Sequence, residues 1–218
     1  MRNLIFSIGF FVAISLTATT NGSIVIFQDS FSVQPSSNGW SESTTSGATI
    51  KVNSMPNGSG PAAVEFENTT GPGSPELFSL TRSISTTGFT DIKLDFSAFQ
   101  NTDGSFDGSG DNEDFLQVKF SVDGGSNFNS LVQDYGKWNG KDVDRDDGFN
   151  DVSTSLFGGP LSLAGAENLA DLQIMISARS TGTEERYFLD NIVVTGVPEP
   201  TSFLLFGLGM VGLSRRRR

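Results

Sequence analysis

The stretch that decides the fold is residues 115–128, FLQVKFSVDGGSNF. Apolar and polar side chains alternate in its first half, which places every second residue on one face of a half-buried strand. The inward set is Leu116, Val118, Phe120 and Val122. Asp123-Gly124-Gly125 follows, and glycine accepts the positive φ that a tight turn requires. The stretch therefore predicts one arm of a β-hairpin, with residues 131–138 as the returning strand.

The same period of two recurs along the chain. It is clearest at residues 91–99, where Ile92, Leu94, Phe96 and Ala98 share one face. Turn-forming residues separate further strands predicted at 24–31, 48–52, 62–67, 76–85, 152–156, 161–163, 172–178 and 187–195. One helical turn is expected at residues 164–169. About ten short strands with almost no helix predict an all-β fold, an antiparallel β-sandwich for which a jelly roll fits best.

The composition excludes several kinds of chemistry. The chain has no cysteine and no histidine. Thiol catalysis, Ser-His-Asp and Cys-His arrangements and the usual zinc sites are therefore ruled out. Residues 23–196 contain nine cations against twenty-four anions, a net charge of about −15. We expect no nucleic-acid binding, because contacts to phosphates need cations.

The two ends of the chain differ from its middle. Residues 1–22 begin with Arg2, continue with an apolar run at 4–16 and end in small and polar residues, which is the layout of a secretory signal peptide. No twin-arginine pair is present, which favours the Sec translocon. We predict a signal peptide at 1–22, a β-sandwich domain at 23–196 and a separate tail at 197–218.

The tail, VPEPTSFLLFGLGMVGLSRRRR, has three parts. The first, Val197-Pro198-Glu199-Pro200, is stiff and extended because each proline fixes φ. An uncharged, mostly apolar run at 202–213 follows, and Arg215, Arg216, Arg217 and Arg218 form a cationic stop. The run would span about 18 Å as a helix, against a hydrocarbon core of about 30 Å. We expect a short transmembrane helix that is extended by flanking residues and by snorkelling arginines.

These three parts, in this order, resemble the PEP-CTERM protein-sorting signal. The resemblance implies recognition by exosortase, a transpeptidase-like membrane enzyme. It also implies a Gram-negative host that makes extracellular polysaccharide. The precursor would then be anchored in the inner membrane, and the mature domain would reach the cell surface or a biofilm matrix.

The segments FLQVKFSVDGGSNF and YFLDNIVVTG (residues 187–196) resemble strands of carbohydrate-binding-module-like jelly rolls, as does the opening at 27–31 with Gly39-Trp40. Such modules often hold a structural calcium between the first and last strands. The resemblance implies Asp29 and Asp190 as its ligands. Alternatively, Asp29 is a turn or edge residue, and Asp190 pairs with Arg186 or Arg179.

Two acidic loops are also candidates for calcium, at residues 101–114 and 140–150. Asp142-x-Asp144-x-Asp146 begins like an EF-hand loop, because crowded carboxylates supply the oxygens that calcium prefers. Asp147 stands where glycine is required, however, and Ser153 where the closing glutamate belongs. A site at Asp142, Asp144 and Asp146 would be irregular, and a solvated acidic loop is the alternative.

A sugar site needs aromatic platforms with polar neighbours. The candidates are Trp40, Tyr135, Trp138 and Tyr187. Tyr135 and Trp138 stand beside the second acidic loop, which favours a glycan-binding site at the edge of that loop. Core packing is the alternative for all four. No carboxylate pair stands out among so many acids. We therefore expect a non-catalytic cell-surface or matrix protein, with a glycan-active hydrolase or lyase and a purely structural calcium-stapled matrix protein as alternatives.

Overall fold

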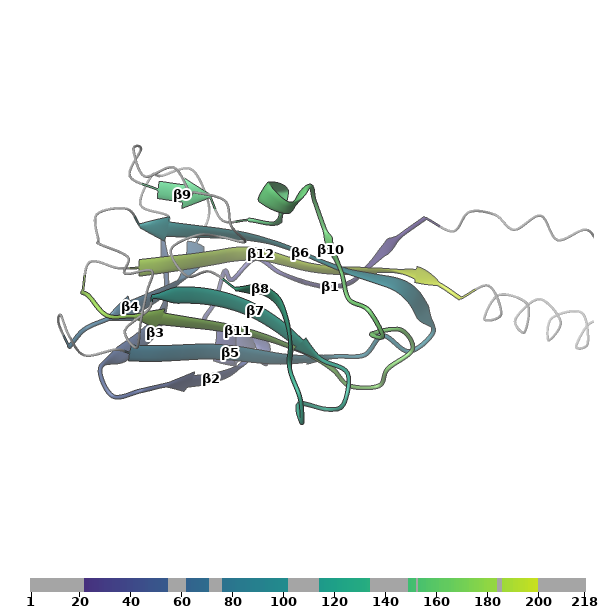
Figure 1. Ribbon diagram of the computed structural model, residues 1–218, viewed down its shortest axis with the longest axis horizontal. Coiled ribbons are helices and arrows are strands. Elements are labelled where there is room, and N and C mark those ends of the chain that lie inside the picture. Colours follow the sequence, from purple (N-terminus) through teal and green to yellow (C-terminus); the bar gives the residue numbers. More distant parts are fainter. Residues whose placement is uncertain are drawn as a thin grey trace, which may run out of the picture.

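The computed structural model describes residues 22–54, 62–70, 76–101, 114–133, 149–151, 153–183 and 186–199. These residues form two antiparallel sheets that lie one above the other (Figure 1). The first sheet, sheet A, contains β1 (Ile24–Asp29), β3 (Ala48–Ser54), β4 (Ala62–Asn68), β6 (Phe89–Asn101), β9 (Phe149–Asp151), β10 (Leu161–Ser162) and β12 (Arg186–Pro198). The second, sheet B, contains β2 (Ser41–Thr44), β5 (Glu76–Ile84), β7 (Phe115–Ser121), β8 (Asn129–Gln133) and β11 (Leu172–Ser180).

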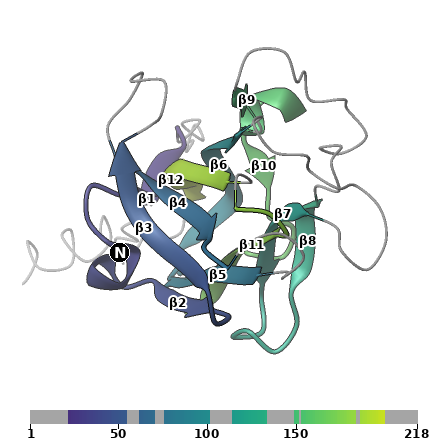
Figure 2. The same cartoon turned by 90° about the vertical axis from the view of Figure 1, so that its left-hand side faces the viewer.

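The chain passes repeatedly from one sheet to the other. After β2 it enters sheet A at β3 and β4, crosses to β5, returns at β6, and crosses again to β7 and β8. It then returns to sheet A at β9 and β10, crosses to β11 and finishes in β12. The view along the strands in Figure 2 shows the two resulting layers. This alternation confirms the predicted jelly-roll sandwich.

Strand β12 is the centre of sheet A. One of its edges pairs with β6 from Tyr187 to Pro198. Its other edge pairs first with β4, from Arg186 to Leu189, and then with β1, from Ile192 to Gly196. The first and last strands of the described chain are therefore neighbours, and Ile24 lies opposite Gly196.

The core contains the inward faces that the alternation predicted. Ile92, Leu94, Phe96 and Ala98 of β6 are at most 2% exposed. On β7, Leu116, Val118 and Phe120 are buried as expected, but Val122 is 36% exposed, so its predicted inward position is wrong. The physical reason is that β7 ends at Ser121, where the turn begins and the alternation no longer applies.

Two further local predictions fail. The strand expected at 152–156 contains instead a 3-10 helix, η2, at Thr154–Phe157, which ends at Gly158 in the left-handed region. The helical turn expected at 164–169 is a pair of turns around Gly165 and Asn168, both with positive φ. In each case a few residues with weak periodicity follow the local turn chemistry.

The outer edge of β6 is covered without a full-length partner strand. β9 pairs with β6 at Phe99–Asn101, and β10 pairs at Lys93–Leu94. Between them, the Ser153 hydroxyl accepts a hydrogen bond from the Ala98 amide at 3.0 Å, and the Thr154 hydroxyl accepts one from the Phe96 amide at 3.4 Å. Side-chain hydroxyls thus satisfy backbone groups that a missing strand would otherwise leave open.

Candidate functional site

The segment that resembles a sorting motif, Val197 to Pro200, begins inside the fold. Val197 lies opposite Thr90, and Pro198 lies opposite Phe89, in the ladder between β12 and β6. The Glu199 amide then donates a 2.9 Å hydrogen bond to the Gly88 carbonyl. Val197, Pro198 and Glu199 are all partly buried. Val197 and Pro198 are extended, as predicted, and strand β12 continues past the predicted start of the tail at 197.

The turn that receives the segment is itself held in place. The Gly88 amide donates to the Asn168 side-chain oxygen at 3.0 Å, and the Asn168 amide donates to the Phe89 carbonyl at 3.1 Å. Just before the segment, Gly196 is packed so tightly that a Cβ there would lie 2.8 Å from the Cδ1 atoms of Ile26 and Ile92. The last residue pairs of β12 therefore contact a turn that is held in place by hydrogen bonds and close packing.

Asp29, at the end of β1, and Asp190, on β12, lie close enough for their charges to interact. They are 5% and 4% exposed. Burial raises the pKa of Asp190, the hydrogen bond from the Asn191 amide opposes that rise, and the charge on Asp29 adds to it. The Asp190 carboxylate accepts hydrogen bonds from the Asn191 amide and side chain, at 2.7 and 3.0 Å.

Asp29 organises the loop that leaves β1. Its Oδ1 accepts the Phe31 amide at 2.8 Å, and its Oδ2 accepts the Asn38 side chain at 2.8 Å and the Trp40 indole at 2.7 Å. These donors compensate one buried negative charge. The pair as a whole supplies two of the six to eight oxygens that calcium prefers. No group of three or more acidic ligands occurs within the described residues.

Several predicted site residues lie outside the described residues: Tyr135, Trp138, Asp142, Asp144, Asp146, Pro200 and Arg215 to Arg218. The predicted signal peptide and most of the tail lie outside them too. Within the described part of the chain, no helix is long and apolar enough to cross a membrane. Trp40 and Tyr187 are 3% and 0% exposed, so core packing, the alternative stated for them, is correct.

Sequence reasoning missed a groove on the outer face of sheet B. The groove has a volume of about 380 Å³. Its central row runs across four strands, because Ser43 pairs with Ser79, Ser79 with Ser177, and Ser177 with Gln117. The neighbouring side chains are Leu77 and Phe115 on one side and Lys119 on the other. The signal was present in the alternation, since these are the polar positions between the inward residues of β5, β7 and β11.

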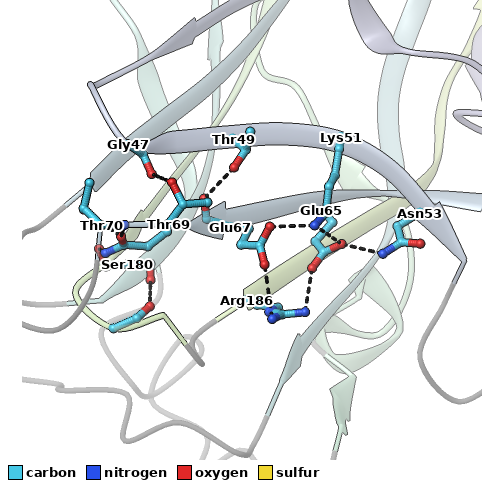
Figure 3. A network of polar contacts seen from close by, with 12 residues as sticks. Gly47, Thr49, Lys51, Asn53, Glu65, Glu67, Thr69, Thr70, Ser180 and Arg186 are labelled. Atoms are coloured by element: carbon cyan, nitrogen blue, oxygen red, sulfur yellow. Dashed lines mark hydrogen bonds and ion pairs between the residues drawn. The ribbon is translucent and has the colours of Figure 1, made fainter.

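The outer face of sheet A carries a charged network instead (Figure 3). The Glu65 side chain is fully buried and lies 3.1 Å from the Arg186 guanidinium and 3.5 Å from the Lys51 ammonium. The Asn53 amide donates to it at 2.8 Å. Glu67 bonds the same two cations, at 2.5 Å from Lys51 and 3.1 Å from Arg186. Both carboxylates are paired, so this network joins β3, β4 and β12 and leaves no free ligand.

Together, these features define a β-sandwich whose last strand runs directly into the C-terminal segment. The family model for the PEP-CTERM protein-sorting motif matches residues 196–218. The chain thus carries that motif, which implies export and processing of a membrane-anchored precursor by exosortase. A search of curated proteins finds no match.

Among solved structures, the chain is similar to carbohydrate-binding modules. The module TmCBM61, solved with β-1,4-galactotriose, is 14% identical, with 74% of this chain and 92% of that one covered and a TM-score of 0.45. The C-terminal family 22 module of Clostridium thermocellum Xyn10B is 15% identical, with coverages of 83% and 97% and a TM-score of 0.42. The CBM22-1 xylan-binding domain of Paenibacillus barcinonensis Xyn10C is 12% identical, with coverages of 83% and 99% and a TM-score of 0.41.

Proposed function

We propose that the chain is an exported cargo protein, sorted by exosortase through residues 197–218, whose sandwich remains as a non-catalytic domain at the cell surface or in the extracellular matrix. The observation that carries this proposal is the PEP-CTERM motif at 196–218. The chain would pass through the Sec translocon and pause in the inner membrane of a Gram-negative cell. Its tail would be the anchor, with Arg215 to Arg218 as the cytoplasmic stop.

Deletion of exosortase in the producing cell tests this proposal. We expect the untrimmed precursor to accumulate in the membrane fraction and the trimmed form to disappear from the surface. Glu199→Ala should slow trimming, whereas Glu167→Ala, which removes an exposed acid from the same end of the sandwich, should not. Trimming that continues unchanged without exosortase would contradict the proposal.

Glycan binding is the second candidate, and the groove on sheet B favours it. Ser43, Ser79 and Ser177 offer hydroxyls, and the Gln117 amide can both donate and accept, which suits a neutral sugar. Leu77 and Phe115 offer apolar surface for the C–H faces of a sugar ring. Because the domain is strongly acidic, a neutral polysaccharide fits better than an acidic one.

A glycan array probed with the 23–199 domain tests the groove. Gln117→Ala should weaken any binding, whereas Gln173→Ala, on the same face of sheet B but outside the groove, should not. If Gln117→Ala and Gln173→Ala weakened glycan binding equally, the groove would not be the binding site. Turnover of any glycan would favour the hydrolase or lyase alternative.

Calcium remains a proposal for the pair Asp29 and Asp190. The support for it is the pair of buried carboxylates, whose mutual repulsion a divalent cation would remove. Bound there, calcium would join the first strand to the last and stabilise the folded state by linkage. It would have a structural role only.

A further inference from the structure

The described chain begins and ends at the same end of the sandwich. Ile24 lies opposite Gly196, and Glu199 reaches only as far as the turn at Gly88 (Figure 1). The turn between β5 and β6 and the loop before β11 lie at this end as well, since Thr86 and Leu169 are hydrogen-bonded. We call this the tail end. The opposite end carries Ser46, in the turn before β3, and Ser180, at the close of β11.

The tail allows little separation between this end and a bilayer. Glu199 is still bonded to the fold, and the apolar run begins at Ser202. Three residues span at most about 11 Å when fully extended. The run itself is short for a hydrocarbon core of about 30 Å, so residues before it are drawn toward the headgroups rather than away from them. By sequence, only Pro200 and Thr201 separate Glu199, the last hydrogen-bonded residue among those described, from the apolar run.

We infer that the tail end of the sandwich lies against the lipid headgroups in the precursor, with the groove on the side of the sandwich, toward the end far from the membrane. This inference rests on the proposed function, because it requires the tail to be inserted. The occupant of the surface is a lipid bilayer.

The surface at the tail end is consistent with that occupant. Ile24 and Val25 are 47% and 53% exposed, and Val122, in the turn after β7, is 36% exposed. Carboxylates lie at the same end, at Asp123, Glu167 and Asp171, so zwitterionic headgroups fit better than anionic ones. The apolar residues of the groove are not at the tail end, because Leu77 and Phe115 lie toward the opposite end of β5 and β7.

In this orientation the groove is accessible to a ligand while the tail is still inserted. The thirteen residues of β12 span about 40 Å from the opposite end to the tail end. A sandwich standing on its tail end would hold its far loops about that distance above the bilayer. Ligand could then reach the groove before the anchor is removed.

The absence of cysteine from the chain makes the test direct. Full-length Thr87→Cys and Ser46→Cys variants, one exposed residue from each end, are labelled with a fluorophore. They are then reconstituted in phosphatidylcholine and phosphatidylethanolamine vesicles that contain a headgroup nitroxide. The label at residue 87 should be strongly quenched, and the label at residue 46 should keep nearly all its fluorescence. Equal quenching at the two positions would overturn the inference.

Two controls separate the possible failures. Carbonate extraction of the same vesicles reports whether the tail is inserted: an extracted chain contradicts the anchor and, with it, the inference. If the chain resists extraction and residue 87 is not quenched, only the inference fails. A Gly-Ser linker of about 20 residues placed after Glu199 should abolish the quenching while anchoring persists, since such a linker is flexible. Quenching that survives the linker would contradict the role of the short connection.

Discussion

The backbone amide of Glu199 is hydrogen-bonded to the carbonyl of Gly88, at 2.9 Å, so the sorting motif starts inside the fold. Thr90 adds a second contact, because its hydroxyl donates to the Val197 carbonyl at 3.3 Å. A transpeptidase needs its peptide substrate extended and free of other pairing. The end of β12 must therefore separate from β6 before the motif can enter an active site.

This relationship predicts that a linker speeds processing. A short Gly-Ser insertion between Gly196 and Val197 frees the motif from the ladder. We expect trimming to become about tenfold faster, the factor that corresponds to about 1.4 kcal/mol, or one or two hydrogen bonds. Pulse-chase labelling in cells that contain exosortase measures it. The same insertion in the turn at Ser126 is the control, and an unchanged rate with the first insertion would contradict strand separation as the slow step.

The Asp29 and Asp190 pair predicts opposite effects of one substitution in two buffers. In chelator, Asp190→Asn removes one of two neighbouring buried charges, so the variant should be at least as stable as the wild type. In millimolar calcium, the wild type should gain about 2 kcal/mol or more if calcium is well above its dissociation constant, and the variant should gain little. Thermal unfolding measures both. A wild type whose midpoint does not respond to calcium would contradict the site.

The turn after β7 predicts a specific acid response. Hydrogen bonds from the Ser121 hydroxyl, and from the Asn127 side chain and backbone, lower the pKa of Asp123 to about 2. Since the folded state holds this carboxylate charged below its ordinary pKa of 3.8, its stabilising contribution is present above that value and is lost as pH falls toward 2. Asp123→Asn should flatten this part of the stability curve, measured by urea unfolding between pH 5 and pH 2. Asp171→Asn, which also removes one negative charge, should leave it in place.

The strands were predictable where one side of the chain is buried and the other is not. Residues 91–99 and 115–121 show this plainly, and their inward residues form the core. The alternation of apolar and polar residues does not show where a strand ends, which is why Val122 was predicted to face inward. It also cannot show coverage by side chains: Ser153 and Thr154 bond to β6 through hydroxyls, a contact that depends on residues far away in sequence.

The candidate sites divide in the same way. The sorting motif is local and collinear, so the sequence alone identified it. The meeting of Asp29 with Asp190 came from a resemblance, and only the pairing of β1 with β12 brings the two together. The groove was not found because its row of Ser43, Ser79, Ser177 and Gln117 is assembled by strand register across four strands. Each residue alone is an ordinary polar position on a strand.

The network around Glu65 predicts unequal costs for its two cations. Arg186→Ala leaves a fully buried carboxylate with Lys51 at 3.5 Å and Asn53 as its remaining partners. We expect a loss of about 3 kcal/mol in the free energy of unfolding, because an uncompensated buried charge is costly. Lys51→Ala removes the more distant ammonium, which is 37% exposed, and should cost about 1 kcal/mol or less.

Denaturant unfolding of the 23–199 domain measures both losses, and the matched control is Lys93→Ala, a half-exposed lysine on β6 that pairs with Asp91 at 3.1 Å. That variant should lie within about 0.5 kcal/mol of the wild type. The double variant Arg186→Ala with Glu65→Gln should recover part of the loss, since it removes the charge that was left unpaired. Equal losses from Arg186→Ala and Lys51→Ala, or no recovery in the double variant, would show that the network contributes through packing rather than through compensation of the buried carboxylate.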